Sequence, residues 1–439
     1  MFASLVLAGC GGGGGTTASS SGGSGSGSTG TSGGGTTTTA YNVANATVDQ
    51  GPTALAAANE AAVNIMYVNV TICAPGSTTN CQTIDHVQVD TGSQGLRILA
   101  SVVNSSLLSA LSPVTVNGGA LAECTQFVDG FSWGPIVTAD MHIGGSDTAT
   151  TGETASSLPV QLIGSGSYSV PADCSSGSVN TTSEDTVATF GANGIIGVGL
   201  FDYDCGSVCV GAANTDNGYY FGCTSSSDCV ETAVPLSSQM INPVFGLAAN
   251  SSGVTDNNGV IIELPPVGTT GAATVTGTLV FGIGTQTNNA LSSSATILTT
   301  DSYYGYVSVN FIGMNFPDSY LDSGSNAYYF NDSSITACGS SSIAPGFFCP
   351  TSPVSLSATI TGNNGAQSSP TFSVANAVNL FNDNSTYAAF SNLAGSAGTD
   401  GASSFAFGLP FFYGHNVYTA MENTNAGGTD GPYFAFSAD

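Results

Sequence analysis

The sequence contains almost no positive charge. Its 439 residues include one arginine, Arg97, and no lysine, against 28 aspartates and glutamates, so the formal net charge is -27. Nucleic acids and anionic lipid headgroups are bound through clustered lysine and arginine side chains, so the composition excludes both as partners. Only 7% of the residues are charged, and we therefore expect a surface built from uncharged polar side chains.

This composition suits an acidic environment. When carboxylates become protonated at low pH, a chain with one arginine and three histidines gains little positive charge. The charge repulsion that drives acid unfolding therefore barely develops. We expect a protein that works in acid, as in an acidophile; the alternative is a preference for uncharged polar surfaces without any adaptation to acid.

Long apolar runs are also missing, since no stretch after the first ten residues could span a bilayer as a helix. Hydrophobic residues still make up 41% of the chain, with 22 Phe and 16 Tyr, so a packed interior is expected. The length allows two lobes, each with its own core.

The first ten residues, MFASLVLAGC, resemble the end of a bacterial lipoprotein signal, in which Cys10 would carry the lipid. Residues 11–40 are nearly all glycine, serine and threonine, which is typical of a flexible linker. Because Gly11 rather than aspartate follows Cys10, the resemblance favours the outer membrane. We therefore predict a protein of the bacterial cell envelope, lipid-anchored at the outer membrane or facing the periplasm, whose only membrane contact is this N-terminal anchor.

Eleven cysteines leave an even number, ten, once Cys10 is set aside, and this indicates an oxidising compartment. Their spacing favours local disulfides and leaves two cysteines for each other, although sequence alone does not prove connectivity. The predicted pairs are Cys73–Cys81, Cys205–Cys209, Cys223–Cys229, Cys338–Cys349 and Cys124–Cys174. No metal site is predicted, because the three histidines lie far apart in sequence and no paired CxxC motif occurs.

Short apolar or alternating runs separated by Gly, Ser, Asn and Pro predict a mainly β protein from residue 64 onward. Only residues 101–111 and 375–381 favour helices. A weak duplication links HVQVDTGSQGL at residues 86–96 with DSYLDSGSNAY at residues 318–328. We therefore predict two β-rich lobes, an N-terminal one over residues 41–250 and a C-terminal one over residues 251–439.

Each copy of the duplication carries Asp-Thr/Ser-Gly-Ser directly after a predicted strand, beginning at Asp90 and at Asp322. A single copy is a common turn. The pair is more informative, because each half also has a later segment of two apolar residues and a glycine. These segments are Ile195-Ile196-Gly197 and Ala406-Phe407-Gly408.

With these motifs the sequence resembles the pepsin-like aspartic peptidases, and in particular a bacterial branch of uncharacterised envelope lipoproteins with a DTGS motif. The likeness extends over roughly residues 64–439. It is carried by residues 89–99 (VDTGSQGLRIL), 125–145 (the flap hairpin), 193–200 (NGIIGVGL), 277–284 (GTLVFGIG), 320–330 (YLDSGSNAYYF) and 407–436 (the final strands). The resemblance implies a bilobal β fold with a cleft between the lobes, a polypeptide substrate and no cofactor.

The resemblance also assigns residue roles. Asp90 and Asp322 would be the catalytic pair, Gly92 and Gly324 would let the backbone come close to the carboxyl groups, and Ser93 and Ser325 would bond their outer oxygens. The hydroxyls of Thr91 and Ser323 would join the two loops. At the flap and substrate cleft, Phe127 replaces the family's tyrosine, and Trp133 would supply an N–H instead. Arg97 replaces a tryptophan, and it either lies beside the pair or binds a local acid such as Asp85.

The predicted function is aspartic endopeptidase activity at acidic pH by a monomeric enzyme, in which the two aspartates activate water. The alternative is a binding or structural lipoprotein of the cell envelope on the same fold, with hydrolysis impaired by the altered flap and Arg97. A Ser-His-Asp hydrolase is disfavoured because the three histidines lie in ordinary strand or turn positions. A glycosidase would also use two carboxyl groups, but its chemistry does not require Asp-Thr/Ser-Gly twice.

Overall fold

The computed structural model describes residues 40–58, 60–145, 152–177, 182–212, 215, 218–399 and 401–438. The predicted lipid attachment site Cys10 and residues 1–39 of the leader and linker lie outside the described residues. Within them the protein is mainly β, as predicted.

Most strands belong to one extended 17-stranded network of paired strands. Its members are β1 (Val43–Val48), β2 (Met66–Cys73), β3 (Cys81–Asp90), β4 (Gln94–Leu99), β5 (Ser112–Pro113), β6 (Thr115–Val116), β7 (Gly119–Gln126), β8 (Phe131–Ile143), β9 (Glu153–Ile163), β10 (Gly194–Val198), β11 (Tyr220–Ser225), β12 (Asp228–Glu231), β13 (Gly259–Leu264), β14 (Val275–Phe281), β15 (Thr296–Thr299), β25 (His415–Ala420) and β28 (Tyr433–Ala438).

A second sheet has seven strands, in the spatial order β21-β20-β16-β17-β24-β18-β23. They are β16 (Val307–Phe311), β17 (Met314–Leu321), β18 (Tyr328–Tyr329), β20 (Thr359–Thr361), β21 (Gln367–Ser368), β23 (Ala394–Gly395) and β24 (Ala406–Phe407). Two further pairs are formed by β19 (Val354–Ser357) with β22 (Thr371–Val374) and by β26 (Asn425–Ala426) with β27 (Thr429–Asp430).

Helices in the described parts of the chain are short. They are α1 (Thr53–Ala57), α2 (Ser105–Leu108), α3 (Ala172–Gly177), α4 (Val187–Phe190), α5 (Ala377–Asp383) and α6 (Leu409–Phe412). The helix expected over residues 101–111 is broken into a 3-10 turn, Ala100–Val102, and α2, because Asn104 caps α2 by accepting a hydrogen bond from the amide of Leu107. None of the helices in the described residues combines the length and apolar character that a bilayer crossing requires.

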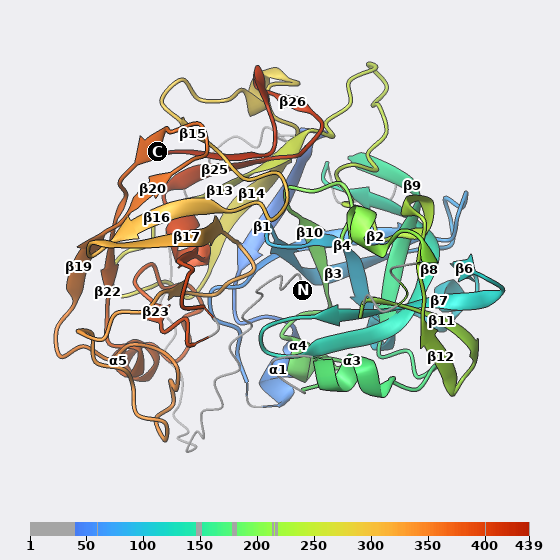
Figure 1. The fold of residues 1–439 in the computed structure, drawn as a ribbon, viewed down its shortest axis with the longest axis horizontal. Helices are drawn as coiled ribbons and strands as arrows, with labels where there is room; N and C mark the ends of the chain where they lie inside the picture. The colour runs from blue at the N-terminus through green and yellow to red at the C-terminus, as the bar shows by residue number, and fades with distance from the viewer. Residues whose placement is uncertain are drawn as a thin grey trace, which may run out of the picture.

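In Figure 1 the strands of the first half, such as β7, β8 and β11, lie on one side, and those of the second half, such as β16, β19 and β22, on the other. Strand β1 joins the halves. It pairs antiparallel with β2 over three residue pairs and with β14 over six. The first described strand is therefore shared between elements that are about 200 positions apart in the chain.

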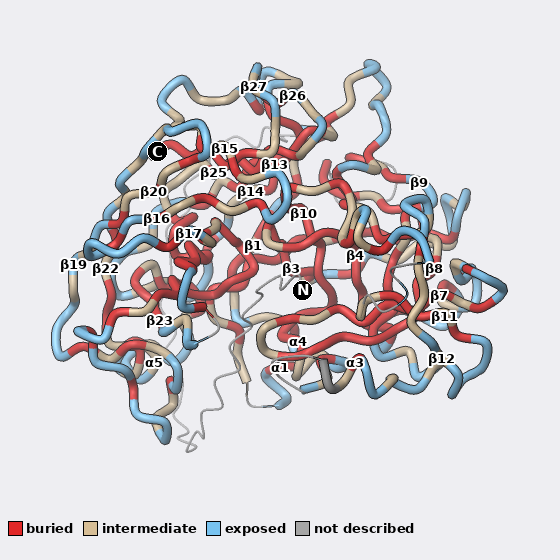
Figure 2. Tube along the Cα trace, in the orientation of Figure 1, coloured by how far each residue is buried: buried red, intermediate tan, exposed pale blue. Residues whose placement is uncertain are grey.

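Apolar side chains from both halves form one large core. Val48, Val89 and Ile196 belong to the same buried cluster as Leu321 and Phe407. Figure 2 shows the buried segments running through the middle of the molecule, where β1, β3 and β10 meet. The two Asp-containing segments thus enter the interior from opposite sides and end in the same buried region.

All five predicted disulfides are present and connect the predicted partners, Cys73–Cys81, Cys124–Cys174, Cys205–Cys209, Cys223–Cys229 and Cys338–Cys349. Four of them close short loops, and Cys124–Cys174 joins β7 to α3. Cross-links of this kind restrict the unfolded chain and so stabilise the fold.

Candidate functional site

The segment around Asp90 forms a strand, a tight loop and a returning strand. Strand β3 ends at Asp90, and β4 leaves in the opposite direction beside β10. Strand β10 runs parallel to β3, with Gly197 opposite Asp90. A Cβ atom on Gly197 would come within 2.7 Å of the backbone of Ser93, so glycine is required for this close approach.

The segment around Asp322 repeats this topology. Strand β17 ends one residue before Asp322, β24 runs parallel to it, and β18 pairs antiparallel with β24. The amide of Asp322 donates to the carbonyl oxygen of Phe407 at 3.0 Å. A Cβ on Gly408 would lie 2.5 Å from the carbonyl oxygen of Ser325, which matches the role of Gly197 in the first half.

Reciprocal hydrogen bonds join the two loops. The amide of Thr91 donates to Oγ of Ser323 at 3.1 Å, and the amide of Ser323 donates to Oγ1 of Thr91 at 2.9 Å. The Ser323 hydroxyl also donates to the carbonyl oxygen of Val89 at 2.8 Å. Each loop is therefore fixed by a side chain of the other, in the arrangement that the resemblance assigned to these two hydroxyls.

The same pattern of donors holds each aspartate. Oδ1 of Asp90 accepts from the amide of Gly92 at 2.7 Å, and Oδ1 of Asp322 accepts from the amide of Gly324 at 2.8 Å. The hydroxyls of Ser93 and Ser325 donate to the respective Oδ2 atoms, the latter at 2.7 Å. These contacts leave little freedom for either carboxyl group to rotate.

The two carboxyl groups lie side by side in the interior, because a Cβ on Gly324 would come within 2.5 Å of Oδ1 of Asp90 and 3.1 Å of Oδ1 of Asp322, and both residues are fully buried. Burial raises the pKa of Asp322 well above its usual range, and the neighbouring Asp90 carboxyl raises it further. Two carboxyl groups this close do not both ionise readily, so the pair is expected to hold one proton between them.

Glycine is needed at the third position of both motifs. A Cβ on Gly324 would lie 2.5 Å from Oδ1 of Asp90, and one on Gly92 would lie 2.8 Å from Oδ1 of Asp322. Each glycine thus makes room for the aspartate of the opposite loop.

Gly324→Ala is therefore expected to separate the two carboxyl groups. Titration of the aspartate side chains by carbon NMR should then show the pKa of Asp322 shifted downward, toward its ordinary value, because its partner is displaced. Gly339→Ala is a suitable control, since a Cβ there would meet no atom within 4 Å. An unchanged titration of Asp322 in Gly324→Ala would show that the loops can move apart without affecting the pair.

Arg97 does not lie in a cleft beside the aspartates, which corrects the first interpretation of this residue. It is 2% exposed and donates from Nη2 to Oε1 of Glu123 at 2.5 Å, with Oδ2 of Asp204 at 3.9 Å. The second interpretation, a structural ion pair, describes its contacts, but Asp85 is not the partner. Asp85 instead accepts from Nδ2 of Asn193.

Phe127 and Trp133 also lie away from the pocket beside the aspartates. Phe127 is buried against Phe190 with ring centroids 6.0 Å apart. Trp133 packs against Phe221 and donates from Nε1 to the carbonyl oxygen of Tyr168 at 3.0 Å. The hairpin β7–β8 spans most of the predicted flap, but its aromatic side chains contribute to the core of the first half.

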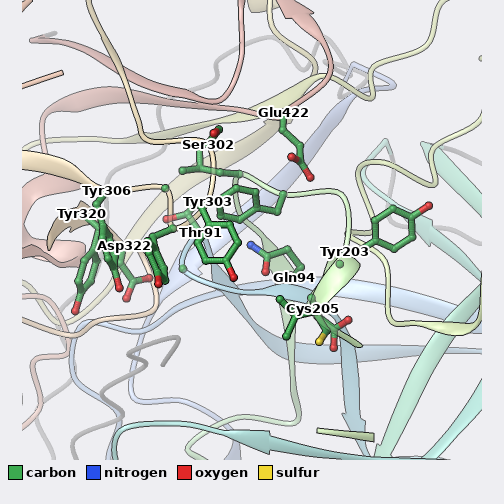
Figure 3. Close-up of a pocket in the computed structure, with 18 of the residues that line it drawn as sticks. Thr91, Gln94, Tyr203, Cys205, Ser302, Tyr303, Tyr306, Tyr320, Asp322 and Glu422 are labelled. Atoms are coloured by element: carbon green, nitrogen blue, oxygen red, sulfur yellow. The ribbon is translucent and has the colours of Figure 1, made fainter. Parts of the chain in front are cut away.

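A pocket of about 240 Å³ begins at Asp322 and continues beneath a group of tyrosines (Figure 3). One end is formed by Thr91, Gly92 and Asp322. The remaining lining comes largely from residues 302–306, residues 203–208 and Glu422, none of which the sequence predicted to be part of a site. The run SYYGY at residues 302–306 was the available signal, because three tyrosines within four positions are unusual in a turn.

The described residues contain no group of three or more His, Cys, Asp or Glu side chains that could hold a metal ion. The site consists of two buried carboxyl groups next to a pocket lined by tyrosine and acidic side chains.

Comparison with known proteins identifies the family of the chain but assigns it no activity. No curated protein matches it. The family model described as "Protein of unknown function (DUF3443)" matches residues 38–436, which is most of the chain and includes both aspartate loops. The protein therefore belongs to the DUF3443 family.

Proposed function

We propose that this protein is an aspartic endopeptidase in which Asp90 and Asp322 activate water to hydrolyse a polypeptide. One observation carries the proposal: two aspartates from distant parts of the chain are buried side by side, each in a loop that supplies the same donors. A pair of buried acids formed only for stability would not require this duplicated set of amide and serine contacts.

The proposal includes a two-lobed, pepsin-like arrangement. The repeated unit around β3, β4 and β10 and around β17, β18 and β24 supports it, because the same topology occurs once in each half. On this view residues 41–250 and 251–439 form the two lobes, and the reciprocal bonds of Thr91 and Ser323 lie at their junction.

The reaction follows from the protonation of the pair. Sharing of one proton between two carboxyl groups is established for aspartic proteases and is carried over to this chain with the resemblance. The ionised carboxyl accepts a proton from a water molecule, whose oxygen attacks the scissile carbonyl carbon. The protonated carboxyl, Asp322, donates its proton to the carbonyl oxygen. The tetrahedral intermediate collapses when Asp90 passes the proton taken from water to the amide nitrogen, which leaves as an amine, while Asp322 takes back a proton from a hydroxyl of the intermediate. No covalent enzyme adduct forms.

The proposed setting is the bacterial cell envelope, with Cys10 as the lipid anchor and a polypeptide as the partner. Five disulfides favour an oxidising compartment such as the periplasm or the cell exterior. The near absence of positive charge supports work at low pH.

A second candidate is a binding or structural lipoprotein on the same fold. It is favoured by the complete burial of both aspartates, and by Phe127 and Trp133, whose side chains are occupied in the core rather than at the pocket.

Acid-dependent cleavage of an unfolded protein would separate the two candidates. Between about pH 2 and pH 7, the purified chain is expected to cleave the substrate fastest at the acid end, where the near absence of lysine and arginine limits charge repulsion and keeps the protein folded. A statine-type inhibitor, which imitates the tetrahedral intermediate, should stop the reaction. Absence of cleavage throughout this range, together with retained binding of the inhibitor, would favour the binding protein.

A further inference from the structure

The pocket beside the aspartates has a tyrosine wall, formed by Tyr303, Tyr304, Tyr306 and Tyr320. The rings follow one another: Tyr303 and Tyr304 meet edge to face at 4.7 Å, Tyr304 and Tyr306 stack at 5.5 Å, and Tyr306 and Tyr320 are 6.2 Å apart. Tyr303 and Tyr304 are 54% and 50% exposed, so much of the wall is accessible.

One side chain holds the turn that carries this wall. Oδ1 of Asp301 accepts from the amides of Tyr303 and Tyr304 at 3.0 and 2.6 Å, and Oδ2 accepts from the amide of Tyr306 at 2.7 Å. The rings are therefore positioned before any ligand arrives, which lowers the entropic cost of binding.

Three carboxyl groups line the other sides of the pocket. Burial raises the pKa of Asp204 and of Asp322 well above the usual range, so Glu422 is the group that supplies the negative charge. Glu422 and Asp204 line it together with Asp322, and Figure 3 shows the carboxyl group of Glu422 directed toward the pocket. Glu422 is fixed through Oε1, which accepts from the amide of Asp202 at 3.0 Å. The only arginine of the chain is buried behind this surface in its pair with Glu123, so no positive side chain lines the pocket.

A polar atom of one residue that lines the pocket also lacks a partner. The hydroxyl oxygen of Tyr320 is buried and has no hydrogen-bond partner among the described residues. Tyr320 precedes Asp322 by two positions at the end of β17, so both residues lie on the same side of the chain. A buried hydroxyl without a partner costs free energy, and a ligand with a polar end would remove that cost.

We propose that this pocket binds a basic side chain, lysine or arginine, of the substrate polypeptide next to the bond to be cleaved. This inference rests on the proposed function. A volume of about 240 Å³ suits one long side chain rather than a whole small-molecule ligand, for which pockets of about 300–1,000 Å³ are usual.

The chemistry of the walls selects the positive charge. The faces of tyrosine rings attract lysine and arginine cations, and the carboxylate of Glu422 would accept a charge-assisted hydrogen bond. The apolar stem of either side chain can lie along the rings. With a net charge of -27, the whole protein also attracts cationic segments.

Binding and cleavage of matched peptides would test this selectivity. The peptides differ at one position, which holds arginine, its neutral analogue citrulline, lysine, norleucine or phenylalanine. Binding is measured by calorimetry with Asp322→Asn over a series of pH values, because burial raises the pKa of Glu422 and the preference for a basic residue should grow as this carboxyl ionises. Cleavage is measured with the wild-type chain. We expect arginine and lysine peptides to bind about tenfold or more tightly than citrulline and norleucine peptides, which corresponds to about 1.4 kcal/mol.

Glu422→Gln should remove most of this preference by weakening the binding of basic peptides while leaving that of neutral ones unchanged. Glutamine keeps an oxygen that can accept from the amide of Asp202, so the local structure is retained. Asp383→Asn, at the exposed end of α5, removes one negative charge away from the pocket and should keep the preference.

Each outcome has a separate meaning. Equal binding of basic and neutral peptides, or tighter binding of phenylalanine, would overturn the basic pocket even if all peptides are cleaved. Selective binding of basic peptides without cleavage by the wild-type chain would leave the pocket in place and overturn the peptidase.

Discussion

Replacing Asp322 with asparagine is expected to lower peptide hydrolysis by about 10³-fold or more without unfolding the protein. Asparagine has the shape of the protonated aspartate and can donate a hydrogen bond to Asp90, but it cannot transfer a proton to the scissile carbonyl. Because general acid catalysis contributes about 10²–10⁴-fold, the lost proton transfer alone accounts for a change of this size. The rate is measured with an unfolded protein substrate in acid, and circular dichroism reports the fold.

Asp90→Asn should abolish activity as well, because the acceptor for the proton of water is lost. Asp383→Asn, an exposed aspartate on α5, serves as the matched control and should keep the wild-type rate. If Asp322→Asn or Asp90→Asn retained a rate within a few-fold of the wild type, the two aspartates would not be the site of hydrolysis and the proposed function would be wrong.

The free energy of unfolding is expected to fall steeply as the pH rises from about 4.5 to about 9. The cause is a set of buried acids whose pKa values are raised by burial and by a neighbouring acidic side chain. Besides Asp322 with Asp90, these pairs are Glu153 with Asp256, Glu184 with Asp129, and Asp204 with Glu123. In each pair burial is the largest cause of the raised pKa, and the second carboxyl group raises it further.

The direction of the pH effect follows from the pKa values of Glu153 and Glu184. Both pKa values are raised from 4.5 to about 9 in the folded protein. The folded state therefore binds these protons more tightly than the unfolded state. Their stabilisation is complete below the unfolded pKa and is lost progressively as the pH rises toward the folded pKa. Each group contributes a slope of about 1.4 kcal/mol per pH unit in this window.

Urea unfolding at several pH values between about 4 and 9 would measure the slope. Glu153→Gln and Glu184→Gln should each flatten it, because a glutamine cannot ionise, and each variant should be more stable than the wild type at the alkaline end. Asp383→Asn provides the comparison, since an exposed aspartate does not share these buried environments. A stability that is constant across this range in the wild type would contradict the buried acid pairs.

Local sequence signals predicted the parts of the fold that depend on neighbouring residues. The alternating run before Asp90 became β3, and the closely spaced cysteines formed the predicted disulfides because short loops bring their ends together at small entropic cost. The same reasoning located both aspartate loops, since each follows directly from the end of a strand.

Features that depend on distant pairing were missed. Glu123 lies 26 residues from Arg97 on a different strand, so no local pattern could identify it as the partner in place of Asp85. Phe127 and Trp133 were assigned by alignment to a flap, but apolar rings gain more free energy by packing against Phe190 and Phe221 than by facing solvent. The tyrosine wall was overlooked because its residues come from a turn and from β17, which meet only in the folded chain.

Because strand β1 pairs with strands of both halves, its removal by truncation at the N-terminus would affect both halves of the fold. Its backbone satisfies hydrogen bonds of β2 on one side and of β14 on the other. A shortened chain beginning after Val48 would leave the edges of β2 and β14 that pair with β1 without partners in the interior of the molecule. Unpaired edges of this kind accept a strand from a neighbouring molecule, so the shortened protein is expected to aggregate.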